Sequence, residues 1–439
     1  MLLAARNGLL RHLRQHKDVY YGGMQRNKSS NSSRSSSTRR LRFLLVLLVL
    51  LGGLAGLLNA EALQRWRYRG TPVADLVAQA RTHPEDLLLL EITGERLLAS
   101  DRALEARDLL LPAAESHPDR ARLALLAGRA AWKSGEEARG GEFLRQAMER
   151  VPADPNARFW MAEFLRSRGY SHEAQDLFQE VTRLDPQYAL AWCRWGEIER
   201  EDEHYEVALE KLERAEKLQP TADTAYHRAA VLQSLGRLAE AEAAARAAYA
   251  RKRNVETATL LGQIVQLTPG PDRAREAQAY LQEAVRLDPA AVETLKLLAL
   301  NQRSLGEHAA AVKTLRRMLR LAPASTDGYL LLGQSYQALG RPLLAGKCLA
   351  IYHGLEPLEV KVTRAEYQAN IGKGSPPSQR ALARAYLEAG RQDMARTVLT
   401  RLLRKQPEDV SAQDLLRQAQ GPPTLKIAPL PPDPEGDRP

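Results

Sequence analysis

The chain has 439 residues and carries 63 Lys and Arg against 53 Asp and Glu, a formal net charge of +10. Residues 1–42 hold ten basic residues and one acidic residue, which leaves 53 basic and 52 acidic residues from Phe43 onward. A nearly neutral body of this kind lacks the basic stripe that phosphate binding requires, so the composition argues against nucleic acid as a partner.

The first part of the chain combines a basic leader with one long apolar run. Residues 1–42 are basic and rich in serine, a composition typical of disorder, and we expect a cytoplasmic leader here. Phe43–Ala60 has no charged residue in 18 positions and would form a helix about 27 Å long, close to the thickness of a bilayer core. The sequence therefore predicts a transmembrane helix over residues 43–60.

The charges around Phe43–Ala60 predict its orientation. Basic residues before the run outweigh those after it, and positive charge favours the cytoplasmic side of a membrane. This bias predicts a single-pass protein of a bacterial inner membrane, with a cytoplasmic N-terminus and the rest of the chain outside the cytoplasm. A cleaved signal peptide is the alternative, because Gly53-Leu54-Ala55 has the small-x-small pattern of a cleavage site.

A unit of 34 residues then repeats, after a juxtamembrane stretch over residues 61–71 and a lone helix expected over Pro72–Thr82. Each unit carries two apolar stripes at three- and four-residue spacing, which predicts two amphipathic helices. In the clearest copy, Ala189–Pro220, small residues at Gly196 and Ala208 would let the two helices approach closely. Prolines mark the interval along the chain: Pro84, Pro118, Pro152, Pro186 and Pro220, then Pro289, Pro323 and Pro357.

Three stretches depart from this period. The fifth pair closes at Arg253 rather than at a proline, and Thr268–Arg273 lengthens the turn inside the sixth pair. Leu358–Ser375 is expected to be an irregular insertion with a short helix around Thr363–Asn370. The tail over residues 421–439 is rich in proline, and we expect it to be extended and disordered.

The repeat resembles the tetratricopeptide repeat, a 34-residue helix–turn–helix unit with a closing proline. The resemblance implies an all-α solenoid of about nine helix pairs over residues 72–420, wound as a right-handed superhelix. It also implies that the first helix of each pair lines a concave face that binds a protein or peptide. Positions mapped onto that face give the predicted partner-binding residues: Arg129, Trp132, Lys133, Phe159, Glu163, Arg166, Glu197, Gln233, Gln263 and Gln334.

Motifs for catalysis are weak throughout the repeats. Gly140–Phe143 spells GGEF but lies inside an expected second helix, and His83 and His117 occupy equivalent turn positions. Cys193 and Cys348 lie about four units apart, too far for a disulfide. We expect no catalytic residue, metal site or cofactor.

These observations favour a non-catalytic scaffold, held at the membrane by Phe43–Ala60, that docks a partner protein or an envelope complex. Two alternatives remain open at this stage. One is a secreted or periplasmic soluble binding protein released by signal cleavage. The other is an accessory subunit of a glycan- or polysaccharide-processing machine.

Overall fold

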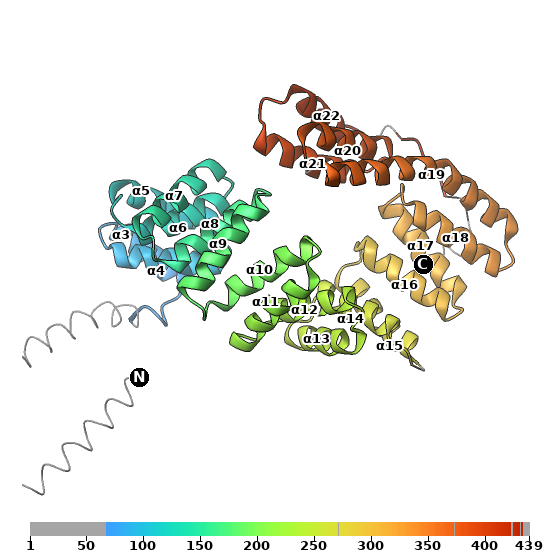
Figure 1. Cartoon of the computed structure of the whole chain (residues 1–439), viewed down its shortest axis with the longest axis horizontal. Helices are drawn as coiled ribbons and strands as arrows, with labels where there is room; N and C mark the ends of the chain where they lie inside the picture. Colours follow the sequence, from blue (N-terminus) through green and yellow to red (C-terminus); the bar gives the residue numbers. More distant parts are fainter. Residues whose placement is uncertain (1–66, 271, 373, 423–424, 431, 433–439) are drawn as a thin grey trace, which may run out of the picture. The chain divides into compact units, whose positions relative to one another are not determined.

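A computed structural model of the chain describes residues 67–270, 272–372, 374–422, 425–430 and 432. The described residues form α-helices joined by short turns, and they contain no β-strand. The described part of the chain divides into two compact units, with the boundary between Arg96 and Leu97. The helices are α3 Val73–Thr82, α4 Leu87–Ala99, α5 Ala103–Ser116, α6 Ala121–Lys133, α7 Glu137–Arg150, α8 Pro155–Ser167, α9 Ser171–Leu184, α10 Ala189–Glu201, α11 Tyr205–Leu218, α12 Ala222–Ser234, α13 Leu238–Arg251, α14 Val255–Leu267, α15 Arg273–Leu287, α16 Val292–Ser304, α17 His308–Leu321, α18 Thr326–Ala338, α19 Pro342–Ile371, α20 Pro376–Glu388, α21 Gln392–Lys405 and α22 Val410–Gln420 (Figure 1).

In the first unit, α3 is the lone helix that the sequence predicts, and α4 follows it in the chain. Leu76, Val77 and Ala80 form the buried stripe of α3. Asp86 caps the start of α4, because its carboxylate accepts a 3.0 Å hydrogen bond from the Leu89 N–H. None of the described helices is both long and apolar enough to cross a bilayer. The predicted leader and the predicted membrane helix, Phe43–Ala60, lie outside the described residues.

The second unit repeats one packing arrangement from α6 to α21. Each helix packs on the helices before and after it in sequence, and first helices such as α6 and α8, or α10 and α12, also contact each other (Figure 1). Contacts therefore run mainly between neighbours, as in a solenoid. The prediction of an all-helical repeat is confirmed for the described residues, and α22 closes the array after the pair α20–α21.

Small residues at the predicted positions bring paired helices into close contact. A Cβ atom on Gly140 in α7 would lie 2.6 Å from the Trp132 nitrogen, and one on Gly128 in α6 would lie 2.8 Å from the Leu144 nitrogen. Backbone atoms cannot move aside as a flexible side chain can, so α6 and α7 approach this closely only with glycine at both places. Gly140 thus has a packing role in the helix that contains the GGEF sequence.

The two cysteines and the turn histidines are also explained by the repeat. Cys193 and Cys348 are free and buried in the described structure. His83 follows the last residue of α3 and lies 3.2 Å from the Glu85 carboxylate. His117 follows the last residue of α5 and lies 3.1 Å from the Ala113 carbonyl oxygen. The two cysteines therefore lie in the helical core, and the two histidines lie at the ends of helices.

The structure differs from the sequence prediction at Leu358–Ser375. Helix α19 does not end at Pro357 but continues to Ile371, a length of 30 residues. Val362, Ala365 and Ala369 on its second half are buried in the core that α20, α21 and α22 share. This burial offsets the hydrogen bond that Pro357 removes from the helix. The short helix expected over Thr363–Asn370 is therefore present, but as part of one extended second helix that links two cores and ends at Ile371, within the expected insertion.

Part of the tail packs against the helices, whereas the sequence predicts an extended and disordered tail. Residues 425–430 have no regular secondary structure, yet Leu425, Ile427 and Leu430 pack against the core that includes α17, α18 and α19. The composition rule that predicts disorder from proline content does not consider the aliphatic residues that alternate within this segment. Residues 433–439 lie outside the described residues.

Candidate functional site

The predicted partner-binding residues lie on first helices, as the sequence indicates, but they do not form one continuous group. Arg129, Trp132 and Lys133 lie on α6, Phe159, Glu163 and Arg166 on α8, and Glu197 on α10. Gln233, Gln263 and Gln334 lie further along the chain, on α12, α14 and α18. The structure brings together the members on α6, α8 and α10 through ring contacts and ion pairs.

An arginine and a tryptophan join α6 to α8. The guanidinium carbon of Arg129 lies 3.7 Å from the centre of the Trp160 ring. This distance is typical of a cation–π contact, in which the planar guanidinium stacks on the aromatic face. Both side chains are partly exposed, so a bound molecule could reach the same ring and the same cation.

Phe159 belongs to the core and is not an exposed anchor. Only 1% of its surface is accessible. Its ring stacks on Tyr188 at 5.1 Å between ring centres and packs on Phe178 at 5.6 Å. The partly exposed aromatic side chain of this helix is that of the next residue, Trp160, which the sequence did not indicate.

The remaining two residues on α6 have different environments. Trp132 is half-buried and meets Phe164 of α8 edge to face, with 5.9 Å between ring centres. Lys133, the last residue of α6, is exposed. Trp132 therefore contributes mainly to packing between helices, whereas Lys133 is available to a partner.

Four charged residues of alternating sign bridge α8 and α10. The Arg194 guanidinium donates a 2.9 Å hydrogen bond to Glu197 and lies 3.4 Å from Glu163. Arg166 lies 3.5 Å from Glu163 and 3.6 Å from Glu197. Each carboxylate thus faces two arginines, and the pairs cross from one helix to the other.

Exposure decides which charge this cluster presents to solvent. The two glutamate side chains are each 12% exposed, whereas those of Arg166 and Arg194 are 27% and 21% exposed. The acidic groups therefore lie deeper than the basic groups. Arg129 and Lys133 add two more cations, and the exposed Glu201, which interacts with Arg166, adds one carboxylate. Cationic groups therefore outnumber acidic groups among these accessible side chains, which favours a ligand that carries carboxylates.

His227 of α12 extends the cluster to a third first helix. Its Nε2 lies 3.7 Å from Glu197, and the side chain is 13% exposed. Burial lowers the pKa of His227, and the neighbouring Arg200 and Arg194 lower it further, although Glu197 opposes them. Burial raises the pKa of Glu197, but His227, Arg194 and Arg166 outweigh it and hold that pKa below the ordinary value.

The predicted glutamines show no such grouping. Gln233 and Gln263 are half-buried on α12 and α14. The Gln334 side-chain oxygen accepts a 2.7 Å hydrogen bond from Arg303 of α16. The idea that the glutamines bind an extended backbone stays a prediction.

A comparison of equivalent repeat positions could have found Trp160 and Arg194. These residues lie 34 positions apart, and Arg228 follows after another 34. The preceding position holds Phe159 and then Cys193, which are both buried. Each unit thus has a buried position followed directly by a more accessible one. To tell the two apart from the sequence, the start of the helix must be known to within one residue.

We call the group formed by Arg129, Trp160, Glu163, Arg166, Arg194 and Glu197 the first-helix surface. It contains no arrangement that resembles a nucleophile with its base. Across the part of the chain that the structure describes, no group of three or more His, Cys, Asp or Glu side chains could hold a metal ion. The first-helix surface offers a bound molecule cationic groups and one aromatic face.

Comparison with known proteins finds a match to a repeat family for one part of the chain. Residues 272–326, which contain α15 and α16–α17, match the family model of the tetratricopeptide repeat. This match supports the repeat type predicted from the spacing of prolines and small residues. Tetratricopeptide repeats generally serve as non-catalytic scaffolds that bind proteins or peptides. No curated protein matches the chain.

Several solved helical-repeat structures resemble the chain at low identity. The Cut9–Hcn1 tetramer of the APC/C has a TM-score of 0.43 and 17% identity. The match covers 79% of this chain and 58% of the matched chain. Pseudomonas aeruginosa pilF has a TM-score of 0.44 and 17% identity, covering 51% of this chain and 99% of its own. YrrB, a TPR protein with an unusual peptide-binding site, has a TM-score of 0.34 and 15% identity, covering 55% and 97%. At these scores the likenesses carry no argument about function.

Proposed function

We propose that this protein is a non-catalytic scaffold that captures an acidic segment of a partner protein on the first-helix surface. The observation that carries the proposal is the exposure difference within the charge cluster, where arginines stand above more deeply buried glutamates. The Arg129–Trp160 stack adds an aromatic face beside this cationic area. Arginine and tryptophan are the side chains that most often dominate binding energy at protein interfaces.

The carboxylates of Glu163 and Glu197 orient the arginines in the proposed binding mode. Glu163 and Glu197 each lie between Arg166 and Arg194, so they hold both guanidinium groups in place before a partner arrives. A preorganised cation loses less side-chain entropy on binding than a free one. The preorganised arginines would therefore favour binding of the partner. Because two glutamates accompany the two arginines, the cluster would add little to the net charge of the surface.

We further propose that Phe43–Ala60 anchors the scaffold in a bacterial inner membrane, with the repeats on the far side from the cytoplasm. The support is the uncharged run of 18 residues and the excess of basic residues before it. An anchor would restrict the search for partners to the membrane surface. The repeats would then act on proteins of the cell envelope.

Site-specific crosslinking in cells tests the partner model. A photoreactive amino acid at Lys133 lies beside the first-helix surface, and one at Arg145 lies on the exposed side of the second helix α7. We expect a partner adduct from position 133 that disappears when Arg129→Glu and Trp160→Ala are combined, with helix content unchanged by circular dichroism. The same adduct from both positions, or one that survives the double substitution, would contradict the model.

A further inference from the structure

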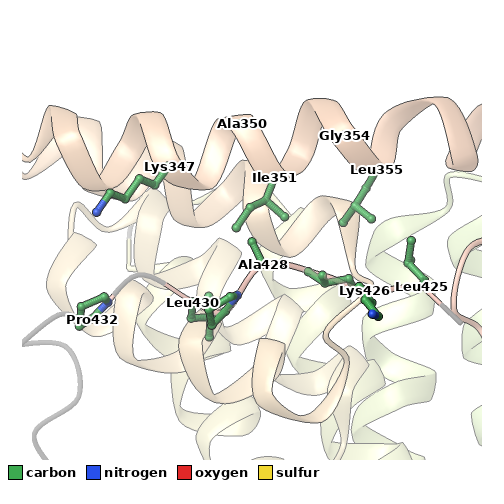
Figure 2. Close-up of a pocket in the computed structure, with 12 residues that line it drawn as sticks. Lys347, Ala350, Ile351, Gly354, Leu355, Leu425, Lys426, Ala428, Leu430 and Pro432 are labelled. Carbon is green, nitrogen blue, oxygen red and sulfur yellow. The ribbon is translucent and has the colours of Figure 1, made fainter. Parts of the chain in front are cut away.

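The tail segment over residues 425–430 lies in an apolar groove formed by second helices. One wall comes from α19, where Lys347, Ala350, Ile351 and Gly354 face the segment (Figure 2). The other wall comes from α17, where Arg316, Leu319 and Arg320 line the opposite side. The groove is separate from the first-helix surface, which uses α6, α8 and α10.

The segment binds the groove through alternating residues. Leu425, Ile427 and Leu430 are half-buried and pack on the core below, whereas Lys426, Ala428 and Pro429 are exposed. Alternation with a period of two is the pattern of an extended chain that places every second side chain in a pocket. Ile427 and Leu430 are three positions apart instead of two, because Pro429 interrupts the alternation.

The chain leads the segment to this groove by a short tether. Helix α22 ends at Gln420, and the Gln392 amide of α21 donates a 3.0 Å hydrogen bond to the Gly421 carbonyl. Leu425 then passes over the turn between α20 and α21, where a Cβ on Gly390 would lie 3.2 Å from its side chain. Only a few residues separate this anchored helix end from the groove.

The segment does not fill the space available to it. An open pocket of about 670 Å³, accessible to solvent, lies between the segment and α19. A further cavity of about 420 Å³ lies between the segment and α17. Sites of several hundred cubic ångströms with mainly apolar walls are typical of ligand pockets. Loose packing of this kind is expected of a segment that can leave, because less dispersion energy and less buried area hold it in place.

We propose that this groove is a second binding site, which takes an extended aliphatic and proline-containing segment of a partner protein, and that residues 425–430 occupy it as an internal competitor. The partner segment has aliphatic side chains at its first, third and sixth positions, as in the sequence from Leu425 to Leu430. Binding of a partner segment displaces the tail from the groove. Only a partner that competes successfully with residues 425–430 can therefore bind there. The scaffold then has two sites of different chemistry, one cationic and one apolar.

A short tether gives the tail an effective concentration of about 1 mM at the groove. A peptide that binds the empty groove with a Kd of about 50 µM would then bind the intact chain roughly 20-fold more weakly, because the tail must first be displaced. The internal segment can therefore close the site even though the contact itself is weak. This ratio is the quantity to measure.

The test uses a fluorescein-labelled peptide with the sequence of residues 421–434, and fluorescence anisotropy as the readout. Binding is compared for the full chain, for a chain that ends at Pro422, and for a full-length chain with Leu425→Asp, Ile427→Asp and Leu430→Asp. The triple variant keeps the tail but removes its apolar contacts, so the outcome does not depend on truncation. Circular dichroism verifies the fold of each.

We expect the truncated chain and the triple variant to bind the peptide at least 10-fold more tightly than the full chain. Adding Ile351→Asp, in the groove, to the truncated chain should abolish binding, whereas Val360→Asp should not. Val360 is the matched control because it lies on the same helix and is 56% exposed. Absence of binding to both tail-released chains, equal binding to all chains, or equal effects of the two aspartates would overturn the proposal.

Discussion

The guanidinium carbon of Arg129 on α6 lies 3.7 Å from the centre of the Trp160 ring on α8. The contact joins two consecutive first helices on their accessible side, where the packing of the repeat does not require a charged residue. The contact can therefore affect the stability of the fold and the binding of a partner, and the two effects can be measured separately. The stability of the contact can be measured without knowledge of the partner.

We predict a coupling of about 1 kcal/mol between Arg129 and Trp160, the magnitude typical of a partly exposed cation–π pair. Arg129→Gln and Trp160→Leu should each lower the free energy of unfolding, and the double variant should lose less than the sum. Urea denaturation of the two single variants, the double variant and the parent gives this coupling as a double-mutant cycle. Strictly additive losses would show that the ring and the cation do not interact.

The close approach of α6 and α7 gives a second prediction. Gly140→Ala places a Cβ 2.6 Å from the backbone nitrogen of Trp132, so the two helices must move apart. We expect a loss of about 1–3 kcal/mol in the free energy of unfolding, the range observed for overpacked cores. Urea denaturation monitored by circular dichroism measures it.

Gly346 in α19 is the matched control for Gly140. A Cβ at Gly346 meets no atom within 4 Å, and the residue is exposed on the helix. Gly346→Ala should therefore raise the free energy of unfolding by about 0.5–1 kcal/mol, because alanine has the higher helix propensity. A loss of stability at position 346, or no loss at position 140, would contradict the packing described for these helices.

His227 makes the stability of the fold depend on pH. Its pKa lies below the ordinary value of 6.5 because of burial first and because of Arg200 and Arg194 next, against the opposing effects of Glu197 and Asp223. The unfolded chain then binds a proton that the folded chain does not, so stability decreases as the pH falls below 6.5 and levels off once the pH is below the folded pKa. Above 6.5 the residue has no effect.

We predict that His227→Gln flattens this pH dependence. Thermal unfolding of the parent should show a midpoint that falls between about pH 7 and pH 5.5, and the variant should show a smaller fall over the same interval. Glu197 does not account for the difference, because its pKa is held below 4.5 and its contribution is lost only at lower pH. Identical slopes for the two proteins would show that His227 is not buried beside the arginines.

The sequence predicts the repeat well because one physical requirement recurs in every unit. Two helices that pack closely need a small residue on each, and Gly128 with Gly140 meets this requirement at the expected positions. The predictions failed in two kinds of place: where a shift of one residue decides which side chain is buried, and where opposing energies decide whether a helix continues. Phe159 and Trp160 are neighbours on one helix turn, so an error of one residue in the helix assignment exchanges the buried position for the partly exposed one.

Helix α19 shows the second kind of limit. Proline is unfavourable inside a helix, so a local rule ends the helix at Pro357. The observed helix continues because Val362, Ala365 and Ala369 reach a core that lies beyond the local sequence. The first-helix charges are partly predictable: Glu163, Arg166, Arg194 and Glu197 follow from repeat position. The place of His227 beside Glu197, in contrast, depends on contacts between units.

Substitution of Pro357 tests this account of α19. Pro357→Ala restores a backbone hydrogen bond within a helix that already continues through this position, and it should raise the free energy of unfolding by up to about 3 kcal/mol. Pro342→Ala serves as the control, because Pro342 occupies the first position of α19, where proline is tolerated. Equal effects of the two substitutions, measured by urea denaturation, would indicate that the helix ends at Pro357 after all.

Membrane topology can be tested by cysteine labelling, because the native thiols give little background. Cys193 and Cys348 are 1% and 0% exposed, and burial raises the pKa of each to about 11, so almost no thiolate is present at neutral pH. A cysteine introduced at the exposed Lys133 should react in spheroplasts with a membrane-impermeant maleimide if the repeats lie outside the cytoplasm. A cysteine introduced at Ser35, in the basic leader, should react only after the membrane is permeabilised. The reverse pattern would contradict the proposed orientation, and recovery of Lys133→Cys chains that lack residues 43–60 would contradict the anchor.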